Sequence, residues 1–261
     1  MLKPSPSRPV GQFKTYWLLL PLGLLVLVGL AGIGWVANQP VFGADEFICE
    51  QDQMTDIDGN SYSTVKIGDQ CWTQEYLRTT RFADGQDIPR PLSNNDWREA
   101  GNNRAGAYAC YDNDLENCEI YGALYNSYAV DRGLCPDGWQ VPSDEDFKEL
   151  EINIGLDPDQ VDWLYWRGDP YGITLAGHYD LWEPDGFRDE PEFGQSGFDA
   201  APAGYRMSGG SYSWLGYRAN IWSSTIQASA WRRTIISTSS GGIRRTAAAK
   251  NFGFSVRCLK K

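Results

Sequence analysis

The sequence is poor in the residues from which most catalytic and metal sites are built. It has one histidine, His178, and none of its 6 cysteines follows another at a spacing of two intervening residues. Zinc sites are built from histidines and closely spaced cysteines, and thioredoxin-like redox sites use two cysteines separated by two residues. The Gly-x-Ser-x-Gly turn of many serine hydrolases is missing as well. We therefore predict a protein that is not an enzyme.

Basic residues are also few, with 23 Lys and Arg against 34 Asp and Glu and a formal net charge of -11. Lys3, Arg8 and Lys14 are the only charged residues before Asp45, so the remainder of the chain is more acidic still. Such a surface repels the phosphates of nucleic acids, and we predict no nucleic-acid partner. An acidic surface suits cations or a basic partner, and it also suits plain solubility.

One long apolar run stands near the N-terminus. Residues 16–37 are 22 residues without a charge, rich in Leu, Val and Gly, and a helix of about this length can cross a hydrocarbon core of roughly 30 Å. The positive-inside rule then predicts a cytoplasmic basic tail (1–15), a transmembrane helix (16–37), a juxtamembrane connector (38–51) and an extracytoplasmic domain (52–261). A cleaved signal peptide is the alternative, although its apolar core is usually shorter.

Small residues crowd this predicted helix, namely Gly23, Gly29, Gly32 and Gly34. Small residues let membrane helices approach one another closely. The run therefore predicts the bilayer as one partner and other membrane-protein subunits as further partners.

The rest of the chain is organised around residues 133–147. Pro136, Asp137 and Gly138 predict a tight turn, and the alternating residues 139–141 predict a short strand. Ser143 then predicts a helix start, because Asp146 stands three residues later as in a capping box. Apolar residues at helical spacing continue this helix to Ile154, and Gly155 predicts its end.

Within this stretch, Leu134-Cys-Pro-Asp-Gly-Trp-Gln-Val-Pro-Ser-Asp144 resembles the signature of the Fibrobacter succinogenes major paralogous domain family. Further segments resemble the family pattern in order, at residues 58–72, 75–78, 110–125, 197–206, 222–225 and 253–258. The family comprises cell-envelope proteins, mostly without an assigned role. The resemblance therefore implies an α+β, C-type-lectin-like domain at a bacterial membrane, facing the periplasm or the outside, and implies no particular activity.

An even number of cysteines behind an apolar segment indicates an oxidising compartment. Six cysteines allow 15 pairings. Cys110 and Cys118 flank a short polar turn and are expected to pair locally, and the lectin-like resemblance implies a bridge between Cys135 and Cys258. Cys49 and Cys71 remain as the third pair.

Between these motifs, residues 83–106 have no periodicity and predict a surface loop, and residues 157–195 form a long, acidic, Trp-rich insertion. Residues 198–258 predict a β-meander with a turn near Gly242. One face of a short helix is predicted from Tyr121, Leu124, Tyr125 and Tyr128.

Two acidic turns are candidate calcium ligands. Glu183-Pro-Asp185 resembles the triplet with which carbohydrate-binding C-type lectins hold calcium, but the Trp-Asn-Asp triplet of those sites is absent, since two serines follow Trp222. Asp112 and Asp114 form the second turn, and such residues also favour turns on conformational grounds. Calcium takes six to eight oxygen ligands. No cofactor is therefore predicted, with calcium as the one candidate.

The aromatic residues of the 157–195 insertion are candidates for stacking on a glycan. Trp163, Tyr165, Trp166 and Trp182 lie among acidic residues with few aliphatic neighbours in sequence. The alternative is that these rings hold the insertion in place. For the whole chain we expect an accessory subunit of a membrane complex. The alternative is a free-standing recognition module that binds a glycan or protein ligand through this insertion.

Overall fold

The computed structural model describes residues 46–184, 187–237 and 241–261. The predicted transmembrane helix at 16–37, with Gly23, Gly29, Gly32 and Gly34, lies outside these residues, as do the basic tail and most of the connector. Among the described residues, no helix has both the length and the apolar character that a membrane crossing requires. The described residues belong to one compact unit, Glu46–Lys261.

The predicted turn, strand and helix around residue 140 are confirmed. Strand β7 (Trp139–Gln140) leads into helix α4 (Asp144–Asn153), which begins at a complete capping box. The Ser143 hydroxyl accepts from the backbone N–H of Asp146, and the Asp146 carboxylate accepts from the backbone N–H of Ser143. Phe147 and Leu150 face inward from α4 and are buried. The capping interactions join residues only three positions apart, so the sequence alone predicts them.

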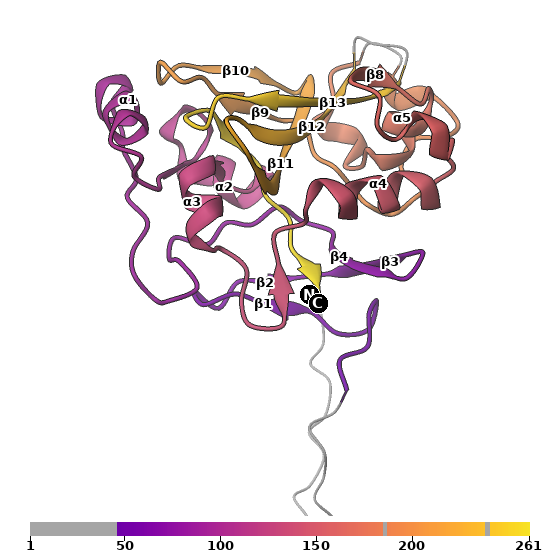
Figure 1. Cartoon of the computed structure of the whole chain (residues 1–261), viewed down its shortest axis with the longest axis horizontal. Helices are drawn as coiled ribbons and strands as arrows, with labels where there is room; N and C mark the ends of the chain where they lie inside the picture. The colour runs from indigo at the N-terminus through magenta and orange to yellow at the C-terminus, as the bar shows by residue number, and fades with distance from the viewer. Residues whose placement is uncertain (1–45, 185–186, 238–240) are drawn as a thin grey trace, which may run out of the picture. The chain divides into compact units, whose positions relative to one another are not determined.

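The strands form several antiparallel sheets (Figure 1). A four-stranded sheet contains β11 (Arg218–Ile226), β12 (Ala230–Ile236), β13 (Ile243–Ala248) and the edge strand β8 (Tyr165–Arg167). A five-stranded sheet has the order β10 (Tyr212–Leu215), β9 (Ala203–Arg206), β14 (Gly253–Phe254), β6 (Leu124–Asn126) and β5 (Tyr108–Ala109). A second four-stranded sheet has the order β3 (Thr64–Ile67), β4 (Gln70–Thr73), β15 (Leu259–Lys260) and β7. A two-stranded sheet pairs β1 (Met54–Thr55) with β2 (Ser61–Tyr62). The predicted meander is present in β11, β12 and β13.

Buried aromatic rings join these sheets. Trp222 of β11 lies 4.4 Å from Phe254 of β14, measured between ring centroids, and both are buried. A second cluster packs Trp72 of β4 against Phe147 of α4 and against Phe198. Burial of rings of this size dominates the energetics of a core.

All three disulfide pairings are confirmed: Cys49–Cys71, Cys110–Cys118 and Cys135–Cys258. The last spans 123 residues and joins the segment before β7 to the segment before β15. The bridge therefore ties the entry of α4 to the end of the chain.

Two local predictions are wrong. The aromatic face predicted from Tyr121 to Tyr128 is not one helix, because α2 (Leu115–Tyr121) ends at Gly122, whose φ of 71° breaks the helix. The chain continues as β6 and then as α3 (Ser127–Arg132). The predicted loop at 83–106 contains a helix, α1 (Asn94–Asn102), which Ser93 caps.

The Trp-rich insertion is more ordered than expected. It contains β8 and the short helix α5 (Tyr171–Leu175), and it contributes Trp182 and Phe187 to the core. Their rings lie 4.8 Å apart. Tertiary packing, rather than local periodicity, organises this segment.

Candidate functional site

The four-stranded sheet presents arginines on both of its faces. Successive residues of a strand point to opposite faces, so Arg232 and Arg233 of β12 diverge, as do Arg244 and Arg245 of β13. The register pairs Arg245 with Arg233, and Arg244 with Thr234. We call the face that carries Arg233 and Arg245 the inner face, and the opposite one the outer face.

On the inner face every arginine has a carboxylate of α4 as its partner. Arg233 donates from Nε to Glu151 and from Nη1 to Asp144, both over 2.6 Å. Arg245 donates from Nη2 to Asp144 over 2.5 Å, and Arg167 of β8 donates to Glu151. All five side chains are buried. Because each buried charge is paired and hydrogen-bonded, this network is a structural link between α4 and the sheet.

Asp144 makes the stability of the domain depend on acid. Burial alone would raise the pKa of this carboxyl, but hydrogen bonds from Arg245 and the charge of Arg233 outweigh burial and lower the pKa to about 2. A carboxyl whose pKa is lowered by folding contributes stability that is complete above its unfolded pKa of about 4 and is lost as the pH falls through about 2.

We expect the free energy of unfolding in urea to fall as the pH decreases from about 4 to about 2. The Asp144→Asn variant should be less stable than the unchanged protein above about pH 4, and its stability should depend less on pH between about 4 and about 2. If the variant shows the same dependence of stability on pH as the unchanged protein, Asp144 is not the group responsible.

On the outer face three arginines have no carboxylate partner among the described residues. Arg218, Arg232 and Arg244 come from the adjacent strands β11, β12 and β13, and we call them the outer arginine cluster. In the part of the chain that the structure describes, none of them forms an ion pair, and the Nε of each is buried without a hydrogen bond. Arg232 alone is held, since its Nη1 donates to Asn220 and to Thr234.

Burial and neighbouring positive charge disfavour the charged forms of Arg218 and Arg232. Burial, and next the neighbouring charges of Arg244 and Arg218, lower the pKa of Arg232 to about 10. Burial lowers the pKa of Arg218 too, and the charge of Arg244 contributes. The outer face therefore gathers three arginines from adjacent strands in a protein with an excess of acidic residues.

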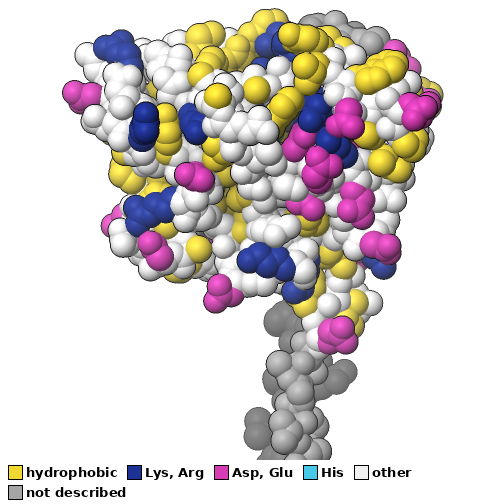
Figure 2. Space-filling model, in the orientation of Figure 1, with side chains coloured by type: hydrophobic (Ala, Val, Ile, Leu, Met, Phe, Trp, Pro, Cys, Tyr) yellow, Lys and Arg dark blue, Asp and Glu magenta, His cyan; other side chains and the backbone are white. Residues whose placement is uncertain are grey.

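Exposed aromatic rings flank this cluster. Trp166 is directly across from Arg244 in the pairing of β8 with β13, and Trp214 of β10 lies 3.7 Å from the Arg218 guanidinium carbon. Tyr165 and Trp214 both have a φ of 68°, which is a genuine outlier for bulky residues. In Figure 2 hydrophobic side chains gather along the upper edge of the view, over β10 and β13, around a basic side chain. Cations and ring faces therefore alternate across this surface.

The predicted glycan-stacking residues differ in exposure: three are on the surface and one is buried. Trp163, Tyr165 and Trp166 are 56%, 60% and 42% exposed, as a surface binding site requires. The prediction for Trp182 is wrong: the ring is only 1% exposed, and its Nε1 donates to the backbone oxygen of Gly177. Trp182 holds the insertion on the core, which is the role that the alternative interpretation gave to these rings.

The described candidate calcium ligands, Glu183, Asp112 and Asp114, do not form a metal-binding group with one another. Glu183 is exposed, and Asp185 lies outside the described residues. Asp112 has a φ of 53° within its turn, and Asp114 caps α2 by accepting from the backbone N–H of Glu116. Within the described ranges no three His, Cys, Asp or Glu side chains are arranged to hold a metal. A role for calcium stays a prediction.

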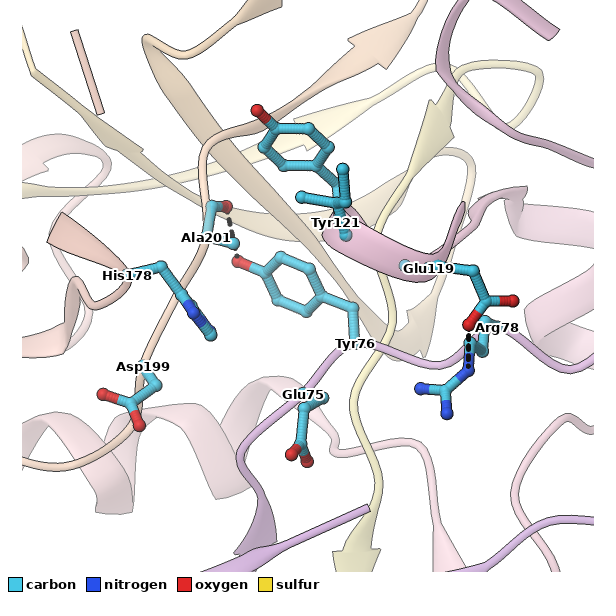
Figure 3. Close-up of a pocket in the computed structure, with 10 residues that line it drawn as sticks. Glu75, Tyr76, Arg78, Glu119, Tyr121, His178, Asp199 and Ala201 are labelled. Atoms are coloured by element: carbon cyan, nitrogen blue, oxygen red, sulfur yellow. Dashed lines mark hydrogen bonds and ion pairs between the residues drawn. The ribbon is translucent and has the colours of Figure 1, made fainter. Parts of the chain in front are cut away.

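A hollow of about 120 Å³ lies between α2 and the segments around His178 and Asp199 (Figure 3). In it, Arg78 pairs with Glu119 over 3.3 Å, and the Tyr76 hydroxyl donates to the backbone of Ala201. Ser, Thr and Cys are absent from its described lining. The hydroxyl groups of its described lining are those of Tyr76 and Tyr121, and the absence of catalysis stays a prediction.

The outer arginine cluster was not predicted from the sequence, although a signal exists. The tripeptide Arg-Arg-Thr occurs twice, at 232–234 and at 244–246, in a chain with an excess of acidic residues. Within strands, such a pair must place one arginine on each face. The pattern does not tell which face is supplied with carboxylates.

A family model, the Fibrobacter succinogenes major domain, matches residues 65–260. The chain belongs to this family. The matched region contains the outer arginine cluster, the aromatic insertion and every disulfide-bonded cysteine except Cys49. A search of curated proteins finds no match, and a search of solved structures finds none either.

Proposed function

We propose that this member of the Fibrobacter succinogenes major domain family is a non-catalytic recognition protein that binds a saccharide through its exposed aromatic residues. One observation carries the proposal: Trp163, Tyr165 and Trp166 expose large rings on and beside the edge strand β8. Exposed rings lose favourable burial unless a ligand covers them. The apolar C–H face of a sugar ring can stack on such a ring, while the polar residues around it meet the hydroxyl groups.

The proposal includes a cell-envelope location. A lectin-like fold, with a membrane helix at 16–37 and the domain outside the cytoplasm, is the arrangement we propose. Three disulfides support an oxidising compartment. The bridge from Cys135 to Cys258, which ties the entry of α4 to the chain end, supports the lectin-like comparison.

A second candidate function is that of an accessory subunit of a membrane complex. The observation that favours it is the crowding of Gly23, Gly29, Gly32 and Gly34 in the predicted membrane helix. In this case the exposed aromatic residues would contact another protein, and the chain would co-purify with other membrane proteins in fixed ratio.

Saccharide binding is tested with the full chain in mild detergent. The probes are cello-, xylo- and galacturono-oligosaccharides, and binding is followed by calorimetric titration. We expect at least one probe to bind, and Trp166→Ala to weaken that binding about tenfold, which corresponds to about 1.4 kcal/mol. Leu115→Ala is the control, because Leu115 is an exposed apolar side chain on α2. The proposal fails if none of the probes binds, or if Trp166→Ala binds as tightly as the unchanged protein.

A further inference from the structure

Arginines on the two faces of the four-stranded sheet have different partners. Arg233 and Arg245 meet carboxylates of α4, whereas their immediate neighbours Arg232 and Arg244 meet none among the described residues. Partly buried like charges disfavour the folded state. Side chains of like charge that are brought together at a cost in stability are typical of a binding site.

The outer arginine cluster has the geometry of an anion site. One arginine comes from each of three adjacent strands, which lie about 5 Å apart. Between them, Asn220 and Thr234 are paired across β11 and β12, and the hydrogen bonds to both fix Arg232. The guanidinium groups of Arg218 and Arg244 make no hydrogen bond in the described part of the molecule, and although their Nε atoms are buried, their Nη atoms remain available. A guanidinium fork matches a carboxylate in a bidentate manner.

The rings beside the cluster restrict the kind of anion. Trp166 is opposite Arg244, and Trp214 covers Arg218, so each available guanidinium has an exposed ring at its side. Tyr165 and Trp214 keep their exposed positions at a φ of 68°, a conformation that bulky residues rarely adopt. A ligand that uses both features carries a negative charge on a ring with an apolar face.

We propose that the outer arginine cluster binds the carboxylate of an acidic saccharide, while Trp166 and Trp214 stack on its rings. This inference rests on the proposed saccharide binding and names its ligand class. Arg218 and Arg244 contact the carboxylate, and Arg232, held by Asn220 and Thr234, supplies fixed positive charge beneath it.

The test compares oligogalacturonate with its methyl ester, because the two share their rings and differ in charge. Calorimetric titration of the full chain is expected to give at least tenfold tighter binding of the free acid. Arg244→Gln should weaken binding of the free acid at least tenfold and leave the weak binding of the ester unchanged. Arg98→Gln is the control, since it removes the same charge from an exposed position on α1. Arg218→Gln serves as a second variant of the cluster.

The outcomes separate this inference from the function on which it rests. Equal binding of the acid and the ester, or an Arg244→Gln variant that binds like Arg98→Gln, would overturn the arginine site and leave saccharide binding intact. If neither saccharide form nor any neutral probe binds, the proposed function itself fails. Displacement of the acid by oligoglutamate or inorganic phosphate at equal carboxylate or phosphate concentration would overturn the assignment to a saccharide. Failure of both to compete supports it.

Discussion

Replacing Glu151 by glutamine is expected to lower the free energy of unfolding by about 3–5 kcal/mol. Glu151 is fully buried and accepts from both Arg167 and Arg233. Its loss leaves Arg167 buried without a carboxylate partner among the described residues, whereas Arg233 keeps Asp144. Breaking a buried ion pair by removing one member costs more than the pair itself contributes, because the remaining charge stays desolvated.

Urea unfolding of the Glu151→Gln variant measures this loss. Glu149→Gln is the matched control: the same change is made two residues earlier on α4, where the side chain is exposed and makes no described ion pair. We expect Glu149→Gln to change the free energy of unfolding by less than about 0.5 kcal/mol. Similar effects of the two substitutions would show that the ion pairs on the inner face do not hold α4 to the sheet.

Removing the disulfide between Cys135 and Cys258 is expected to cost about 5 kcal/mol. A disulfide stabilises a fold in the chain-entropy model by restricting the unfolded chain, and the effect grows with the loop it closes. This bridge closes a separation of 123 residues, against 8 for Cys110–Cys118. The same model gives about 2.5 kcal/mol for the short bridge.

Double alanine variants of the two bridges allow a direct comparison, because all four cysteines are buried and alanine leaves no polar atom behind. Unfolding is measured with guanidinium chloride under oxidising conditions. The Cys135/Cys258 variant should have the clearly lower midpoint. If the two variants unfold at the same denaturant concentration, the long bridge does not restrict the unfolded chain as proposed.

Sequence predicts this fold best where neighbouring residues determine it. The capping box of Ser143 and Asp146 joins residues three positions apart, and it was predicted correctly. The face that runs from Tyr121 to Tyr128 was predicted wrongly, because its apolar spacing fits a helix while Gly122 ends one. Periodicity alone does not reveal such an interruption.

The candidate site is harder to predict, because its character depends on distant residues. Trp166 and Trp182 occur in the same acidic insertion, yet one ring is exposed and the other is buried against Phe187. The inner face is neutralised by Asp144, which lies 89 residues before Arg233. No local pattern shows that α4 covers that face, or that the arginines of the outer cluster have no ion pair among the described residues. The outer arginine cluster therefore emerges only from the three-dimensional arrangement.

The most direct test of the proposed site is the thermal unfolding of the full chain with oligogalacturonate and with its methyl ester. A ligand that binds only the folded protein raises the unfolding midpoint by mass action. We predict that the free acid raises the midpoint, that the ester at equal concentration does so far less, and that Arg244→Gln abolishes the difference. Equal midpoints with acid and ester would contradict an arginine site for acidic saccharides.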